Sequence, residues 1–366
     1  MIRILHGADL HLDSPFQALD RDRAIARRAE QREILRRIAA LAVEWQVDVV
    51  LLAGDLFDSK GAYPETARLL GEVLSALPMP VFIAPGNHDR YSPHSAWDSI
   101  AFGENVHVFK DETIACVEME NLGLRVWGTA FTDRYRTPPL AGFEAPTKGN
   151  MLDVMILHGE LGNPASNYGA ISQQDIARSG MDYVALGHVH AASGLCKAGN
   201  TFYAWPGCPE GRGFDELGEK GVYVLELEKG DCRCEFVPLD GRRYEIKEVD
   251  ITNVADVLEA VERALPTDTG RDIYRIRLVG ETDETPDLTA LNRALVGRFY
   301  VLELRDETVI RRDIWAGRGE DSLKGLFLSR LYGMQEAAQD DEERECITQA
   351  VRWGLRAMEK GEEFPL

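Results

Sequence analysis

Five short polar clusters stand directly after apolar runs of the sequence, and they hold five of its eight histidines. Aspartate, asparagine and histidine in this mixture are ligands for divalent metals of hard to borderline character. Two such ions side by side form a site that hydrolyses phosphate esters. The clusters are Asp9-Leu10-His11, Gly54-Asp55, Gly86-Asn87-His88-Asp89, His158-Gly159 and Gly187-His188-Val189-His190. The pattern therefore predicts a dinuclear metal site.

The clusters differ in what they offer a metal. Asp55 can bridge two cations through its two carboxylate oxygens, and Asn87 offers a neutral carbonyl oxygen after the turn that Gly86 permits. His188 and His190 leave one strand two residues apart, so each can serve a different ion. The seven candidate ligands are Asp9, His11, Asp55, Asn87, His158, His188 and His190.

His88 and Asp89 are the candidate catalytic residues. Seven ligands suffice for two partly open metal positions, so His88 is left free to face the scissile phosphate. An imidazole suits a general acid, or a donor to the developing charge, because it titrates near neutrality. Asp89 either orients His88 or caps the following helix. Two divalent ions against Asp9 and Asp55 leave about +2 of charge, which suits an anionic phosphodiester.

The elements that must position these clusters alternate between strands and helices. Strands are expected over residues 2–7, 47–53 and 80–84, and amphipathic helices over 23–45 and 64–77. This order predicts a layered α/β core with right-handed crossovers. In open α/β sheets ligands collect beyond the carboxyl ends of strands, so several strand ends can deliver the clusters to one point.

A chain of 366 residues is long for a single core, so more than one domain is expected. After residue 105 short strands broken by turns predict a β-rich second layer, and the catalytic domain is expected to span residues 1–240. Renewed strand and helix patterns predict a small α+β accessory domain over 241–320. Residues 321–366 are expected to form a charged helical tail that is a candidate partner-binding segment.

The net charge of −20 is unusual for a protein that binds a nucleic-acid backbone. Residues 21–37 are a local exception, because they hold seven arginines and three acidic residues. This stretch is either a solvated helix face or a face that tracks phosphates. For the second alternative the candidate substrate contacts are Arg27, Arg28, Arg36 and Arg37, together with Arg212.

The six cysteines are scattered along the chain, which favours reduced, structural thiols in a cytoplasmic protein. The first residues have neither the length nor the flanks of a signal peptide, and no apolar stretch reaches membrane-spanning length. A cytoplasmic protein without membrane contact is therefore expected.

The five clusters resemble the motifs of the calcineurin-like metallophosphoesterase superfamily. Longer segments, residues 8–16, 53–58, 183–190 and 206–221, resemble its DNA-repair exonuclease branch of SbcD- and YhaO-type proteins. The resemblance covers about residues 1–240. It implies a layered α/β fold, a metallophosphoesterase β-sandwich flanked by helices, followed by a small α+β domain and a helical C-terminal tail.

The resemblance also implies how the ligands are shared, with His88 catalytic and manganese as the usual metal. It implies an SMC-like, SbcC-like ATPase as partner, held by helices near the C-terminus, and it leaves a homodimer open. At Asp58 the sequence departs from the branch, because some relatives carry there a histidine linked to exonuclease activity. One ion would be held by Asp9, His11, Asp55 and His190, and the other by Asp55, Asn87, His158 and His188.

The expected function is a manganese-dependent phosphodiesterase of the repair-nuclease type, acting on DNA as a 3′–5′ exonuclease or endonuclease. A hydroxide between the two ions would attack phosphorus in line while His88 assists the leaving oxygen. Two alternatives stay open. One is a small-molecule phosphodiesterase or phosphatase with the same site, which the acidic composition favours. The other is a non-catalytic scaffold, which the complete set of candidate ligands disfavours.

Overall fold

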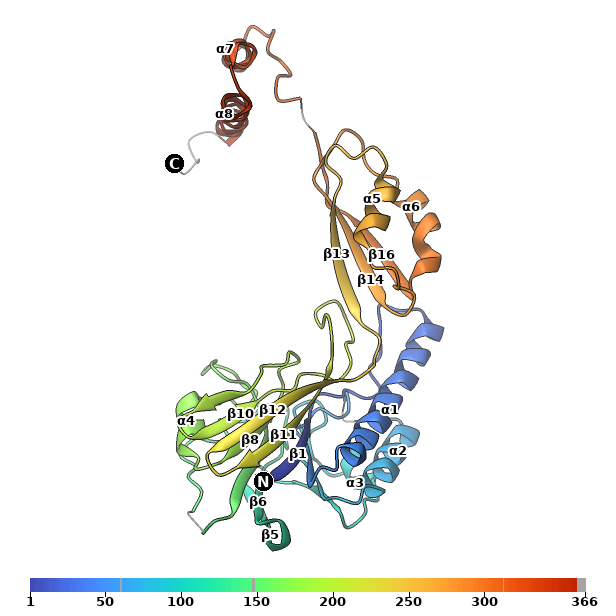
Figure 1. Ribbon diagram of the computed structural model, residues 1–366, viewed down its shortest axis with the longest axis vertical. Helices are drawn as coiled ribbons and strands as arrows, with labels where there is room; N and C mark the ends of the chain where they lie inside the picture. Colours follow the sequence, from blue (N-terminus) through green and yellow to red (C-terminus); the bar gives the residue numbers. More distant parts are fainter. Residues whose placement is uncertain (60, 147–148, 312, 361–366) are drawn as a thin grey trace. The chain divides into compact units, whose positions relative to one another are not determined.

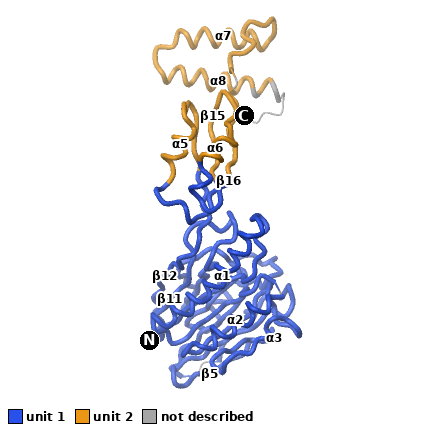
Figure 2. Tube along the Cα trace, turned by 90° about the vertical axis from the view of Figure 1, so that its right-hand side faces the viewer, with its two compact units in different colours: residues 1–247, 266–275, 295–303 blue, residues 248–265, 276–294, 304–366 orange. Residues whose placement is uncertain are grey.

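The computed structural model describes residues 1–59, 61–146, 149–311 and 313–360. The chain forms two compact units, shown in different colours in Figure 2. The first comprises Met1–Lys247, Pro266–Arg275 and Leu295–Glu303, and the second comprises Glu248–Leu265, Ile276–Ala294 and Leu304–Leu366. Among the described residues no helix combines the length and the apolar character needed to cross a membrane.

The first unit contains two six-stranded sheets. The first sheet has the order β12-β11-β1-β2-β3-β4. Strands β1 to β4 run parallel to one another. At one side β11 pairs antiparallel with β1, and β12 pairs antiparallel with β11. The bounds are β1 (Ile2–Gly7), β2 (Val49–Leu52), β3 (Val81–Ile83), β4 (Val106–Val108), β11 (Gly221–Glu228) and β12 (Asp231–Pro238).

The second sheet has the order β5-β6-β7-β8-β10-β9. Its four inner strands are parallel, and the two edge strands β5 and β9 are antiparallel to their neighbours. A 3-10 turn, η1 (Glu120–Leu122), connects β5 to β6. The bounds are β5 (Ala115–Met119), β6 (Leu124–Gly128), β7 (Leu152–His158), β8 (Tyr183–Gly187), β9 (Cys196–Ala198) and β10 (Thr201–Ala204).

The two sheets pack face to face, and helices cover their outer faces (Figure 1). Between the sheets, Ile4 and Leu51 of the first belong to one buried cluster with Val154 and Ile156 of the second. Strands buried on both faces read as continuous apolar runs, which is why the sequence predicts them well. The helices are α1 (Arg21–Glu44), α2 (Pro64–Ser75) and α3 (Ala96–Ser99) on the first sheet and α4 (Gln173–Arg178) on the second. The expected layered β-sandwich flanked by helices is confirmed.

After β12 the chain forms a three-stranded sheet of order β13-β14-β16 and a two-stranded parallel pair, β15 and β17. Two terminal helices, α7 and α8, pack against each other. The bounds are β13 (Tyr244–Asp250), α5 (Val257–Ala264), β14 (Ile273–Val279), β15 (Glu281–Thr282), α6 (Leu288–Leu295), η2 (Val296–Arg298), β16 (Val301–Asp306), β17 (Val309–Ile310), α7 (Leu323–Ala337) and α8 (Asp341–Lys360).

A buried ion pair ties two neighbouring strands of the second sheet. Arg125 of β6 lies directly opposite Asp153 of β7, and its Nη2 donates to the Asp153 carboxylate at 2.7 Å. The other carboxylate oxygen accepts from the indole N–H of Trp127 at 2.9 Å. Both charged residues are buried, so each depends on the other to offset the cost of removing it from water.

Replacing Asp153 with alanine is expected to lower the free energy of unfolding by about 3–5 kcal/mol, because the buried guanidinium loses its counter-charge. Urea unfolding followed by tryptophan fluorescence measures the change. Asp231→Ala, at the exposed first residue of β12, is the matched control, with an expected effect within about 0.5 kcal/mol. Equal unfolding midpoints for the two variants would contradict the importance of this pair.

Candidate metal centre

The polar clusters all follow strands of the sandwich, and both sheets contribute. Strands β1, β2 and β3 of the first sheet are each followed by one cluster, and β7 and β8 of the second sheet end in the other two. The carboxyl ends of these parallel strands lie together, so residues far apart in the chain become neighbours. All seven candidate ligands are buried or half-buried.

The backbone turns sharply at several of these residues. Asp9, His11, Asp55 and His188 have φ angles of 55°, 44°, 50° and 97°, in the left-handed region that few non-glycine residues adopt. Backbone hydrogen bonds hold the turns: the amide of Asp9 donates to the carbonyl of Gly54, and the amide of His11 to that of Asp55, both at 2.9 Å. Such strained conformations persist where the surrounding structure fixes them, and they concentrate at functional sites.

Gly187 lets the two sheets approach each other at this edge. A Cβ atom at Gly187 would lie 1.9 Å from the carbonyl oxygen of Ala53 and 2.9 Å from Nδ1 of His158. Neither neighbour can move aside cheaply, because one is backbone and the other is a buried ring that itself bonds the Ala53 carbonyl at 2.9 Å. A residue without a side chain is therefore required where β8 passes the end of β2.

Asp55 lies between histidines of the two candidate metal positions. Its Oδ2 atom is 3.2 Å from Nε2 of His158 and 3.7 Å from Nε2 of His11. Its Oδ1 atom accepts the backbone N–H of His88 at 2.9 Å. A carboxylate with one oxygen facing two imidazoles from different strands is suitably placed to bridge two cations.

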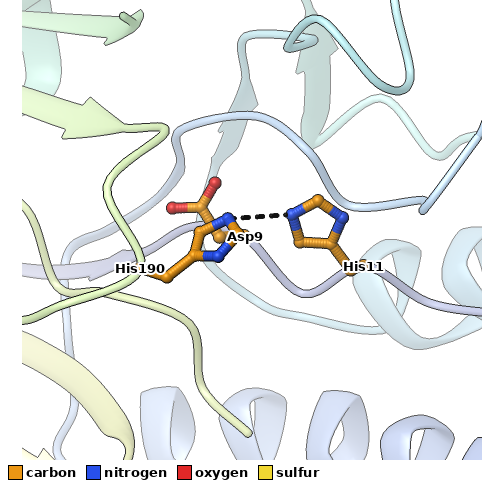
Figure 3. A group of neighbouring side chains, drawn as sticks. All are labelled: Asp9, His11 and His190. Atoms are coloured by element: carbon orange, nitrogen blue, oxygen red, sulfur yellow. Dashed lines mark hydrogen bonds between the residues drawn. The ribbon is translucent and has the colours of Figure 1, made fainter. Parts of the chain in front are cut away.

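The other ligands divide around Asp55. Asn87 Oδ1 lies 3.1 Å from Nε2 of His158 and 3.2 Å from Nδ1 of His188. On the other side Asp9, His11 and His190 form a compact group, in which the two Nε2 atoms of the histidines lie 3.2 Å apart (Figure 3). The structure thus brings together all seven candidate ligands.

Burial and charge perturb these groups strongly. Burial raises the pKa of Asp9 to about 6 and lowers the pKa of His11 and of His188 to about 4. Burial also disfavours the charged form of His158, but the carboxylates of Asp55 and Asp9 outweigh it and raise the pKa to about 9. Burial opposes ionisation of Asp55, yet His158 and His11 hold the pKa of Asp55 well below its usual range.

This donor set fits two divalent cations. Two buried carboxylates, one amide oxygen and four imidazoles converge. The raised pKa of His158 means that the carboxylates favour its protonated form, and a cation in its place would be favoured for the same reason. Mixed oxygen and nitrogen donors suit manganese, iron or zinc better than calcium.

His88 is exposed beside this group, whereas Asp89 is buried beneath it. Nδ1 of His88 donates to the carbonyl of Asp58 at 3.0 Å, and its ring packs edge-on against His11 with centroids 4.9 Å apart. The Asp89 carboxylate accepts the amides of Leu56, at 2.7 Å, and of Gly86, also at 2.7 Å. The expectation that Asp89 orients His88 or caps a helix is therefore wrong, because Asp89 braces two turns of backbone.

Two of the candidate substrate arginines are occupied elsewhere. Arg27 is fully buried and donates to Glu210 at 2.7 Å, to Glu30 and to the carbonyl of Gly211 at 3.0 Å. Arg27 cannot reach a DNA backbone from this position, so that expectation is wrong. Arg212 likewise faces protein carboxylates and has 18% of its side chain exposed.

The remaining three arginines lie on the outer surface of α1. Arg28 is half-buried and donates to the carbonyl of Pro15 at 3.4 Å. Arg36 is exposed and pairs with Glu33 at 3.2 Å, and Arg37 donates to the carbonyl of Asp240. These contacts leave the guanidinium groups of Arg28 and Arg36 at the surface.

Comparisons with known proteins identify a family and several relatives. Residues 2–192 match the family described as calcineurin-like phosphoesterase. The uncharacterized metallophosphoesterase YhaO of Bacillus subtilis is 30% identical over 275 residues, 71% of this chain and 67% of that protein. The SbcD component of the nuclease SbcCD of the same organism is 24% identical over 270 residues, 63% of this chain and 67% of that component.

An archaeal relative extends the similarity. The DNA double-strand break repair protein Mre11 of Methanopyrus kandleri is 26% identical over 278 residues, 69% of this chain and 60% of that protein. The chain spans about two thirds of the length of the curated relatives it matches.

Metal binding is expected to release protons. His158, with its pKa raised to about 9, and Asp9, with its pKa raised to about 6, must lose their protons before they can coordinate. The affinity for Mn²⁺ should therefore rise by about tenfold per pH unit between about pH 6.5 and 8.5. Calorimetric titration in buffers of different ionisation enthalpy measures the release, expected to be about one proton at about pH 7.5. An apparent enthalpy that does not depend on the buffer would contradict it.

Proposed function

Because the chain belongs to the calcineurin-like phosphoesterases, which are metal-dependent phosphoester hydrolases, we propose that it is a manganese-dependent nuclease that cleaves phosphodiester bonds of DNA. The observation that carries the proposal is the Asp55 carboxylate, whose Oδ2 atom lies within 3.7 Å of histidines from both groups of candidate ligands. An Asp, Asn and His set shared around one carboxylate is the donor arrangement that a pair of divalent ions requires.

In this proposal each metal position is built from both sheets. When bound, the two ions supply positive charge for the phosphate and an activated water as nucleophile. The protein's own side chains would fix the positions of the ions. One position takes Asp9, His11, Asp55 and His190, and the other takes Asp55, Asn87, His158 and His188.

His88 is the proposed catalytic residue that is not a metal ligand. Its Nδ1 atom donates to the carbonyl of Asp58, which leaves Nε2 as the nitrogen available to substrate. From its exposed place beside His11, the ring in its imidazolium form, with a hydrogen on each nitrogen, donates the Nε2 hydrogen bond to the phosphate. It then transfers that proton to the leaving oxygen and becomes the neutral imidazole.

DNA is the proposed substrate because two of the relatives are named as part of a nuclease and as a DNA double-strand break repair protein. Arg28, Arg36 and Arg37 on α1 are the proposed backbone contacts. A small-molecule phosphodiesterase is the second candidate, and the net charge of −20 supports it, because a strongly acidic protein repels a nucleic-acid backbone.

An SMC-like ATPase is the proposed partner, bound through the tail over residues 321–366, whose described part contains α7 and α8, with residues 241–320 as an accessory domain. Residues 361–366 lie outside the part of the chain that the structure describes. The support is apolar surface on α7, where Leu323 is 76% and Leu326 is 68% exposed. Amphipathic helices with such residues commonly dock into apolar grooves of other proteins. The six free cysteines fit a reducing compartment, and a cytoplasmic location is proposed on that basis.

The catalytic role of His88 is tested by replacing it with alanine. The variant is expected to bind two Mn²⁺ ions per chain as the parent does, and to cleave about 10²–10⁴-fold more slowly, because only proton transfer and a hydrogen bond are lost. Cleavage of an end-labelled DNA duplex and of a chromogenic diester is measured in parallel, and His107→Ala, at an exposed position of β4, is the control.

The parent protein decides between the candidate functions in the same assay. Degradation of the duplex supports the nuclease. Cleavage of the chromogenic diester with an intact duplex would contradict DNA as substrate and favour the small-molecule alternative. Mn²⁺ binding without cleavage of either substrate would overturn the proposed activity as a whole.

The tail proposal is tested with Leu323→Asp combined with Leu326→Asp, which places charge on exposed apolar positions. Co-purification with an SMC-like ATPase from the same organism should be lost, while hydrolysis of the chromogenic diester stays unchanged. Val43→Asp, at a position of α1 that is 50% exposed, is the control and should keep the partner. Retention of the ATPase by the α7 variant would show that this face does not bind it.

A further inference from the structure

The histidines of one candidate metal position each have a carboxylate on the ring side that faces away from the metal. Nε2 of His11 and Nε2 of His190 face each other at 3.2 Å. Behind them, Asp58 Oδ1 lies 3.3 Å from Nδ1 of His11, at ion-pair distance but without the geometry of a hydrogen bond. Glu216 Oε1 lies 2.7 Å from Nδ1 of His190. Neither acid was among the residues that the sequence pattern singled out as ligands or catalytic groups.

Arg212 connects the two carboxylates. Its Nη1 donates to Asp58 Oδ1 at 3.1 Å, its Nη2 to Glu216 Oε1 at 2.6 Å, and its Nε to Glu216 Oε2 at 3.3 Å. The backbone amide of Arg212 also donates to Glu216 Oε2 at 2.8 Å. Nη2 of Arg212 also lies 3.1 Å from Nδ1 of His190, whereas Glu216 Oε1 lies closer to that ring nitrogen, at 2.7 Å. Every side-chain nitrogen of Arg212 has a carboxylate partner, so Arg212 is poorly placed to bind a substrate phosphate in addition.

We propose that Asp58, Arg212 and Glu216 form a carboxylate clamp that fixes the orientation and the protonated nitrogen of His11 and of His190, so that both rings present Nε2 to the same metal ion. The clamp residues act through the histidines and are positioning residues. The inference rests on the proposed function, because it takes the two histidines as ligands of one ion.

The physical reason lies in the two nitrogens of a neutral imidazole. One nitrogen carries the proton and the other carries the lone pair that binds a metal. A carboxylate beside Nδ1 favours the proton there and frees Nε2 for the metal. Arg212 beside Nδ1 of His190 would by itself favour the opposite arrangement, so the shorter contact with Glu216 decides which nitrogen of His190 is protonated. A carboxylate acceptor also makes the opposite nitrogen a stronger donor to the metal. The 2.7 Å contact between Glu216 and His190 is suited to this role.

The charge of the clamp also suits a cation. A guanidinium beside a metal ion would by itself repel it, but one positive charge between two carboxylates leaves a net charge of about −1. Arg212 is thus compatible with a neighbouring divalent ion only as long as both acids remain. Glu216 has 4% of its side chain exposed, so little water screens its charge.

Separate contacts hold both sides of the clamp in place. The hydroxyl of Ser14 donates to Asp58 Oδ1 at 3.0 Å and to the carbonyl of His11 at 2.8 Å. In the loop that carries Arg212, Glu210 pairs at 2.7 Å with the buried Arg27 of α1. Arg27 therefore serves the site by anchoring this loop. The clamp is a fixed part of the fold that needs no substrate to form.

The test measures metal binding and does not depend on activity. The full chain is freed of metal with a chelator and titrated with Mn²⁺, and free Mn²⁺ is followed by electron paramagnetic resonance. The parent is expected to bind two ions. Arg212→Gln and Glu216→Gln should each lose about 10–100-fold in affinity at one position and keep the other. Arg68→Gln, on the exposed surface of α2, should bind as the parent does.

Coupling gives a second measurement. The variant that combines Arg212→Gln with Glu216→Gln tests whether the clamp acts as a unit. In that case it should lose little more affinity for Mn²⁺ than either single variant, whereas two independent effects would multiply. Circular dichroism of the metal-free variants checks folding. If Arg212→Gln fails to fold, the nearly isosteric Glu216→Gln and Asp58→Asn carry the test.

The outcomes separate this inference from the proposed function. Unchanged Mn²⁺ binding at both positions in Glu216→Gln and Arg212→Gln, or equal losses at both positions, would overturn the clamp. Unchanged Mn²⁺ binding together with weakened DNA binding in Arg212→Gln would make Arg212 a substrate contact instead. A parent protein that binds fewer than two Mn²⁺ ions would overturn the proposed dinuclear function itself.

Discussion

The buried carboxylate of Asp55 depends on a positive partner, and in this fold a close partner comes from the opposite sheet. A carboxylate removed from water is stable only when it is paired and hydrogen-bonded, and His158 of β7 lies 3.2 Å from it. The two sheets must therefore meet at the end of β2 as well as through their apolar faces. Gly187, which permits the contact with the Ala53 carbonyl, and the left-handed turn at Asp55 both serve this close approach.

The parts of the fold that the sequence predicts well are those buried on both sides. Strand β1 has the bounds expected from its apolar run, and β7 closely follows the apolar run before His158. The edge strand β12 has no continuous apolar run, because its side chains alternate between an exposed face and a buried or half-buried one. The short helices α3 and α4 have too few turns to show an apolar period, so only the structure reveals them.

The site was predictable to the extent that polar residues at strand ends stand out from apolar surroundings. The roles of Arg27 and Asp89 were not predictable, because the sequence alone does not distinguish a buried, paired arginine or aspartate from a solvated or catalytic one. Arg27 meets its partner Glu210 across 183 positions of sequence, and no local pattern indicates such a contact. Glu216 lay inside a segment that resembled the family, but only its 2.7 Å contact with His190 suggests what it does.

The distance along the chain between His11 and His190 has a consequence for how the protein is made. The two histidines that meet at 3.2 Å are 179 residues apart in sequence. Contacts between residues so far apart in sequence form late and slowly in folding. The chain must lose the entropy of closing a large loop before the contact contributes any favourable free energy. During synthesis, the first sheet's parallel strands would be complete well before β8 leaves the ribosome. A nascent chain would therefore hold Asp9, His11 and Asp55 without their partners, and capture of a metal would mark the moment at which the sandwich closes.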